Sequence, residues 1–200
     1  MSINVETVRG ILEGGGKVAF SNNQMSSTMC ESVPIRPAAY GVYDNFRMAK
    51  AAIGDNIITM TGTKSNDRTA NAIKIEYDDN YACCGSIGAP SFIYSDGFSG
   101  CEFHLYRGPL NYIHAVHASR ASKKLADPTD YFTKRGGTRI YRWDSLGAIP
   151  DELLMKYCTG AVLAVVNRNQ IDVFALAIKD QVVHSVIQHD TVQINAAIPA

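Results

Sequence analysis

The chain has 200 residues, a length typical of one compact domain, and we expect a single domain over residues 1–200. Hydrophobic residues make up 46% of the composition, which excludes an intrinsically disordered chain. Lys plus Arg and Asp plus Glu each number 19, so the formal net charge is zero. We therefore do not expect a protein that binds nucleic acid through bulk positive charge.

The longest apolar run, Ala161 to Val166, is strand-sized and too short to span a membrane, so we expect no membrane partner. The first residues, Met1 to Glu6, lack the basic region and the apolar core of a conventional signal peptide. If the protein leaves its cell, we expect it to use another route.

The predicted elements begin with a helix over Val5 to Glu13, whose apolar residues recur on one face at helical spacing. The glycines at positions 14–16 end this helix. Strands are predicted at Lys17 to Ser21 and at Asn56 to Gly62, whereas Tyr43 to Ile53 is ambiguous.

In the second half of the chain, short alternating or apolar runs predict further strands, and Asp151 to Tyr157 predicts a short helix. Because strands dominate and the helices are short, the expected fold class is α+β, with an antiparallel β-sandwich and peripheral short helices. The further strands are expected at 72–77, 92–94, 138–142, 161–166, 171–178 and 182–188.

The clearest hairpin joins two alternating runs, residues 101–107 and 112–118, through a turn at Gly108-Pro109. If the turn is centred on the proline, Cys101 faces His117 across the hairpin. Side-chain alternation independently places both residues on the inward apolar face.

A cysteine beside a histidine is the pairing that nucleophilic thiol chemistry requires, because the imidazole can take the thiol proton. Cys101 is the candidate nucleophile and His117 the candidate base. Gly100 lets the backbone approach a substrate carbonyl, and the backbone amides near Ser99 and Gly100 can bind an oxyanion. If the register slips, His114 replaces His117 beside the cysteine.

The other cysteines predict neither a disulfide framework nor a zinc site, because the total of five is odd and no CxxC spacing occurs. A metal site built from His104 and His114 would lack an identifiable third ligand. We expect no metal and no cofactor. The remaining cysteines are Cys30, Cys83, Cys84 and Cys158.

The segment Phe98-Ser99-Gly100-Cys101, with a histidine on the next strand, resembles the catalytic signature of the glutamine deamidases similar to cytotoxic necrotizing factor and Burkholderia lethal factor. The resemblance covers residues 92–118. In that family a threonine can lie six residues before the cysteine, and here Ser95 occupies that position. Asp96 and Gly97 replace the bulkier residues expected between this position and the triplet.

This resemblance implies a cysteine-dependent amidohydrolase that converts a glutamine of a target protein to glutamate through a thioester. It implies that Cys101 attacks the carboxamide, that His117 moves the proton and that Ser95 orients the imidazole. It also implies a monomeric bacterial toxin or effector that is secreted without a conventional signal peptide or delivered into the cytoplasm of a target cell.

Two other readings of the same residues stay open. The first is a cysteine protease or a transglutaminase-like acyl transferase, which would use the same acyl-enzyme intermediate. The second is a non-catalytic β-sandwich binding module, in which Cys101 is a buried apolar residue.

Overall fold

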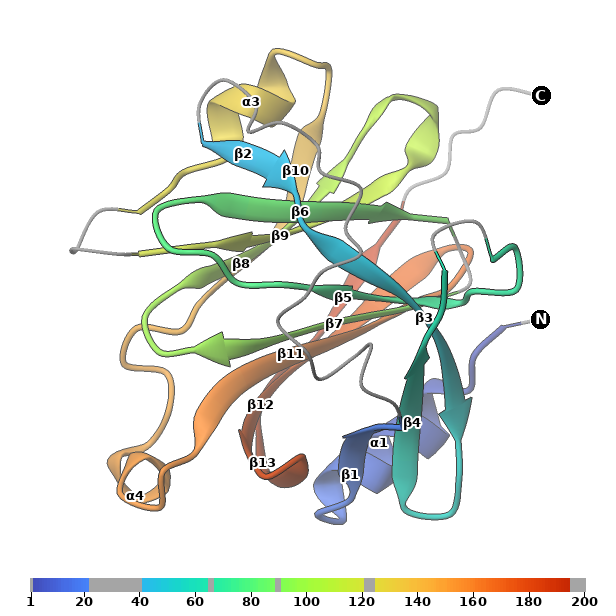
Figure 1. The fold of residues 1–200 in the computed structure, drawn as a ribbon, viewed down its shortest axis with the longest axis vertical. Coiled ribbons are helices and arrows are strands. Elements are labelled where there is room, and N and C mark those ends of the chain that lie inside the picture. The colour runs from blue at the N-terminus through green and yellow to red at the C-terminus, as the bar shows by residue number, and fades with distance from the viewer. Residues whose placement is uncertain (1, 22–40, 65–66, 89–90, 121–124, 195–200) are drawn as a thin grey trace.

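The computed structural model describes residues 2–21, 41–64, 67–88, 91–120 and 125–194, most of which lie in two β-sheets (Figure 1). The larger sheet closes into a barrel, with the strand order β1 (Lys17–Phe20), β13 (Val182–Gln193), β12 (Gln170–Lys179), β11 (Thr159–Val166), β7 (Ser91–Phe98), β5 (Ala72–Ile75), β3 (Phe46–Ile53) and β4 (Ile57–Gly62). The smaller sheet has the order β10 (Thr138–Asp144), β8 (Glu102–Arg107), β9 (Ile113–Ala118), β6 (Ala82–Ile87) and β2 (Val42–Asp44).

The described helices are short, as expected from the sequence. Helix α1 begins where the side chain of Asn4 accepts a hydrogen bond from the N–H of Thr7, and it ends at Gly14. Its buried face packs against the barrel strands, because its apolar residues recur at helical spacing. The helices are α1 (Val5–Glu13), η1 (Pro109–Asn111), α3 (Thr129–Thr133) and α4 (Asp151–Leu154).

The strand-dominated α+β class is confirmed, but the simple antiparallel sandwich is wrong. Strands β1 and β4, β5 and β7, and β2 and β6 pair in parallel, so both sheets are mixed. The larger sheet closes because β1 pairs with β13 on one side and with β4 on the other. Alternation along the sequence indicates which face of a strand is buried and not which strands pair, so it could not predict this closure.

The apolar run in β11 explains how one strand can be buried on both faces. Ala161, Leu163 and Val165 lie in the core that α1 covers. Val162, Ala164 and Val166 lie in a second core, to which the smaller sheet also contributes. Successive side chains of a strand point to opposite faces, so a continuous apolar run is required here.

Strand β6 was not predicted, and it separates two cores. Cys83 lies in the core between the sheets, and the next residue, Cys84, lies in a core on the outer face under α3. The two cysteines therefore point to opposite faces, as extended backbone requires.

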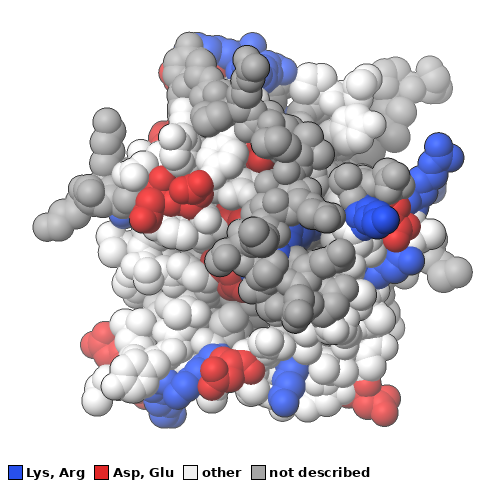
Figure 2. Space-filling view, in the orientation of Figure 1, with Lys and Arg blue, Asp and Glu red and all other residues white. Residues whose placement is uncertain are grey.

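On the face drawn in Figure 2, the described Lys and Arg side chains are dispersed among Asp and Glu. This distribution agrees with the balanced composition of the chain. Within the described ranges, no helix combines the length and the apolar character that crossing a membrane requires.

Candidate active site

The hairpin of β8 and β9 carries the candidate site, with η1 as its turn. Phe103 pairs with His117, so the predicted pairing of Cys101 with His117 is wrong by two residues. The turn is centred on Leu110, where the backbone adopts a positive φ of 63°, and not on Pro109. Because a shift of two residues preserves the alternation, Cys101 still shares the inner face with Phe103 and His117.

Ser95, on β7, fixes the orientation and the tautomer of His117. Its Oγ lies 3.0 Å from the carbonyl oxygen of Ile75 and 2.9 Å from Nδ1 of His117. The carbonyl can only accept, so the single hydroxyl hydrogen points to Ile75 and the hydroxyl oxygen accepts from Nδ1–H. His117 therefore carries its hydrogen on Nδ1 and has a lone pair on Nε2.

Apolar surroundings keep the His117 ring neutral. The residue is 1% exposed, and the Phe98 ring stacks on it with centroids 3.9 Å apart. Burial lowers the pKa of His117 to about 3. Nε2 is buried, and it has no hydrogen-bond partner in the part of the chain that the structure describes. A neutral imidazole with a free lone pair is the form that a general base requires.

Cys101 lies between β7 and β8 and is 6% exposed. Burial raises the pKa of its thiol, while hydrogen bonds from the backbone N–H groups of Arg120 and Ser99 oppose this shift. No described hydrogen bond joins this thiol to Nε2 of His117. The site therefore holds a neutral thiol and a neutral imidazole on the same face of one hairpin.

Tyr77 covers the site on its outer side. It is 44% exposed, and its ring centroid lies 5.2 Å from that of His117. Its hydroxyl donates a hydrogen bond to Asp79. The buried imidazole of His117 therefore contacts a ring that is itself exposed.

Two side chains, those of Ser145 and Arg120, form hydrogen bonds to the backbone at Gly100. Its N–H donates to Oγ of Ser145 at 2.8 Å, and the same oxygen donates to the carbonyl of Cys101 at 2.8 Å. Nε of Arg120 donates to the carbonyl of Gly100 at 2.6 Å. The backbone φ of +134° at this position strongly favours glycine. In this conformation the Gly100 N–H is therefore bonded to Ser145, whereas the backbone N–H of Ser99 is hydrogen bonded to the thiol.

A buried carboxylate holds Arg120 in place. Glu102 is 1% exposed, and its Oε1 accepts from Nη2 of Arg120 at 2.6 Å and from Nη2 of Arg142 at 2.7 Å. Burial is the largest single influence and raises the pKa of Glu102, but the hydrogen bonds of Arg142 and the neighbouring cationic groups together outweigh it, so the pKa is lowered. His104 lies 3.0 Å from the same carboxylate and is 1% exposed.

The alternative base, His114, lies on the other face of β9. It pairs with Tyr106 and Ser86, and its Nδ1 lies 2.5 Å from Oγ of Ser86. His114 therefore points away from Cys101, and His117 is the histidine that shares a face with the candidate nucleophile.

The described cysteines are free thiols, and each is buried. Cys30 lies outside the described residues. The described part of the chain contains no group of three or more His, Cys, Asp or Glu side chains that could hold a metal ion. The free cysteines are Cys83, Cys84, Cys101 and Cys158.

Sequence reasoning missed Tyr77, Arg120 and Ser145, although all three contact the site. Arg120 and Ser145 each follow the end of a strand that flanks β8, so strand register brings them to Gly100. No local motif marks them, and only the strand pairing could have identified them. Comparisons with protein-family models, with curated proteins and with solved structures give no match to this chain, so its function is inferred from the geometry.

Proposed function

We propose that the chain is a cysteine-dependent protein glutamine deamidase that acts as a bacterial toxin or effector on a target protein. The observation that carries this proposal is the tautomer of His117, which Ser95 fixes with a free lone pair on Nε2. The base and the thiol share the inner face of the β8–β9 hairpin, and the orienting residue contacts the base from β7. The resemblance of residues 92–118 to the deamidases supplies the substrate class.

In the proposed reaction, Nε2 of His117 takes the thiol proton and Sγ of Cys101 bonds to the side-chain carbonyl carbon of glutamine. The C–N bond breaks as His117 returns the proton to the leaving nitrogen, and ammonia departs. Water then gives a proton to His117 and attacks the thioester. The C–S bond then breaks and His117 returns the proton to the sulfur, so the products are glutamate and the free thiol and no reactant besides water is needed.

The backbone N–H groups that hydrogen bond to the sulfur are our candidates for binding the oxyanion. These N–H groups belong to Ser99 and Arg120. The hydrogen bond from the Arg120 side chain to Glu102 holds Arg120 in place. The role of Gly100 in this proposal is to fix the backbone beside Cys101, because its own N–H is bonded to Ser145.

The target protein opens the site in this proposal. Tyr77 lies against the His117 ring, so a docked target must displace it to bring a glutamine side chain to the thiol. We expect the enzyme to act as a monomer in the cytoplasm of its target cell.

The test is expression of the wild type and of Cys101→Ser in eukaryotic and bacterial cells, with Cys158→Ser as a control at a buried cysteine outside the site. We expect the wild type and Cys158→Ser to convert specific glutamines to glutamate, a mass gain of about one dalton, and Cys101→Ser to lose this activity. Chain cleavage would indicate a protease, and an added amine would indicate an acyl transferase. The absence of any Cys101-dependent modification rejects the proposal.

The second candidate is a non-catalytic binding protein, which the burial of Cys101 and its missing hydrogen bond to His117 favour. Alkylation by iodoacetamide at neutral pH separates the two, because Cys101 is 6% and Cys158 is 4% exposed. A catalytic site predicts faster alkylation of Cys101, and a slower rate in His117→Ala. Equal rates at the two cysteines support the binding protein.

A further inference from the structure

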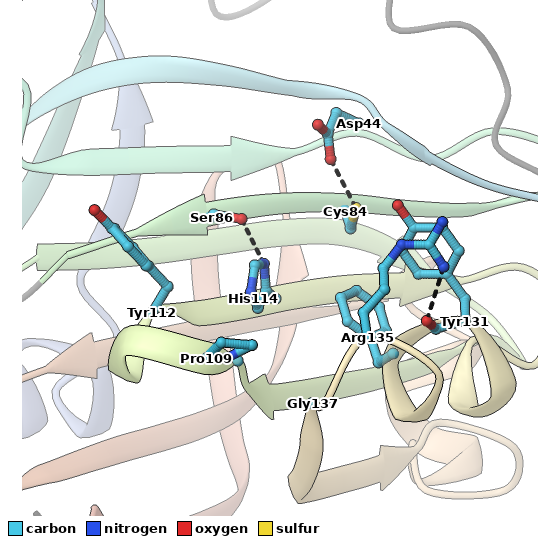
Figure 3. Close-up of a pocket in the computed structure, with 11 residues that line it drawn as sticks. Asp44, Cys84, Ser86, Pro109, Tyr112, His114, Tyr131, Arg135 and Gly137 are labelled. Carbon is cyan, nitrogen blue, oxygen red and sulfur yellow. Dashed lines mark hydrogen bonds between the residues drawn. The ribbon is translucent and has the colours of Figure 1, made fainter.

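A cavity lies on the opposite face of the strands that carry the candidate active site (Figure 3). Its volume is about 380 Å³, which falls in the range of small-molecule pockets. Strands β2, β6 and β9 form one side of the cavity, and α3 with the residues after it forms another. His114 lines this cavity, whereas His117, three residues later, faces the candidate active site.

Asp44 provides a carboxylate at the β2 side of the cavity. Its Oδ1 accepts a hydrogen bond from the Cys84 thiol at 2.9 Å. Burial raises the pKa of Cys84 well above its ordinary value, so the thiol stays protonated and acts as a donor. No Lys or Arg in the described ranges forms an ion pair with Asp44. The carboxylate therefore keeps unused acceptor positions for a ligand.

Arg135 provides a guanidinium at the α3 side of the cavity. It stacks over the Tyr131 ring at 3.8 Å from the centroid, and its Nη1 donates to the Tyr131 carbonyl at 3.1 Å. It forms no ion pair with any carboxylate of the described chain. Since a guanidinium has five N–H donors, several remain free.

An apolar wall joins the two charged ends. Phe132 packs on His114 with ring centroids 5.4 Å apart, and Pro109 and Tyr112 line the cavity beside the histidine. The His114 ring is fixed by Ser86, and Gly108 leaves room for it, since a Cβ on that glycine would lie 2.4 Å from Nε2. Such a wall can bury an apolar side chain beside the two charged groups.

We propose that this cavity binds a free α-amino acid with an apolar side chain. The ammonium group contacts Asp44, the carboxylate contacts Arg135 and the side chain packs on Phe132. A simple organic cation would leave the arginine unpaired, and a simple anion would leave the aspartate unpaired, whereas a zwitterion satisfies both. This inference does not depend on the deamidase proposal, because no residue is shared between the two sites.

The test is calorimetric titration of the full chain with L-leucine, L-methionine and L-phenylalanine. For the tightest of these, the amine without the carboxylate and the acid without the amine are titrated in parallel. We expect the amino acid to bind roughly tenfold or more tightly than either analogue, because each lost contact is a hydrogen bond to a charged group. No binding by any of the three amino acids, or equal binding by the amine or the acid, overturns the proposal.

Substitutions at Asp44 and Arg135 test whether these side chains make the two charged contacts with the ligand. Asp44→Asn and Arg135→Gln should each weaken binding roughly tenfold, whereas Arg168→Gln, at an exposed position outside the cavity, should not change it. Unfolding midpoints of the same proteins show whether each variant is folded. Unchanged binding in either cavity variant contradicts the assignment, and Cys101→Ser should bind like the wild type whatever the fate of the deamidase proposal.

Discussion

The neutral His117 ring has a measurable consequence for stability in acid. The pKa of His117 is about 3 in the folded protein and 6.5 in the absence of the fold. As the pH falls below 6.5, the unfolded chain takes up a proton at this residue and the folded protein does not, so stability decreases. Between pH 6.5 and 4.5 this residue alone should cost roughly 2 kcal/mol, and the loss levels off below about pH 3.

The substitution that tests this effect is His117→Asn, which removes the titrating group and keeps an amide N–H that can donate to Ser95. Free energies of unfolding in urea are measured at pH 6.5, 5.5 and 4.5. His184→Asn, at an exposed position of β13, is the control. We expect the wild type and the control to lose roughly 2 kcal/mol more than His117→Asn over this range, because other groups contribute equally to all three. Parallel pH profiles for the wild type and His117→Asn would refute the buried, neutral imidazole.

Three further substitutions test the packing of the site through urea unfolding. Ser95→Ala leaves the buried Nδ1–H of His117 without an acceptor and should cost about 1–3 kcal/mol; a loss below about 0.5 kcal/mol contradicts the hydrogen bond. Gly100→Ala should cost about 1–3 kcal/mol because of the φ of +134°, while Gly88→Ala, with nothing within 4 Å of the added Cβ, should change stability by less than about 0.5 kcal/mol. Equal effects at the two glycines argue against strain. Glu102→Gln removes a buried partner of two arginines and should cost about 3 kcal/mol, and wild-type stability in this variant would show that the network contributes little.

The elements with strong local periodicity could be predicted from the sequence. The helix Val5–Glu13 has its predicted bounds, and the β8–β9 hairpin and the closing strands β11 to β13 form where expected. Strand β6 was missed, because Cys83, Cys84 and Gly85 give no clear alternation of apolar and polar residues. Barrel closure was missed because it depends on pairs such as β1 with β13, which are distant in sequence and leave no local pattern.

The geometry of the candidate site, like the fold, could be predicted from the sequence only in part. The inward face of Cys101 and His117 follows from alternation, and that part of the geometry could be inferred from the sequence alone. The register could not, because Leu110 takes a left-handed backbone conformation that moves the centre of the turn. The roles of Tyr77 and Arg120 depend on where separate strands end in space, and a single sequence contains no signal for that.

The burial of the described cysteines bears on how this protein could survive outside a reducing cytoplasm. Oxidation of a thiol to sulfenic acid requires exposed thiolate, and Cys101 is protonated and covered in the resting state. Oxidation of this sulfur should therefore be slower than that of an exposed thiolate, even without a disulfide to protect it.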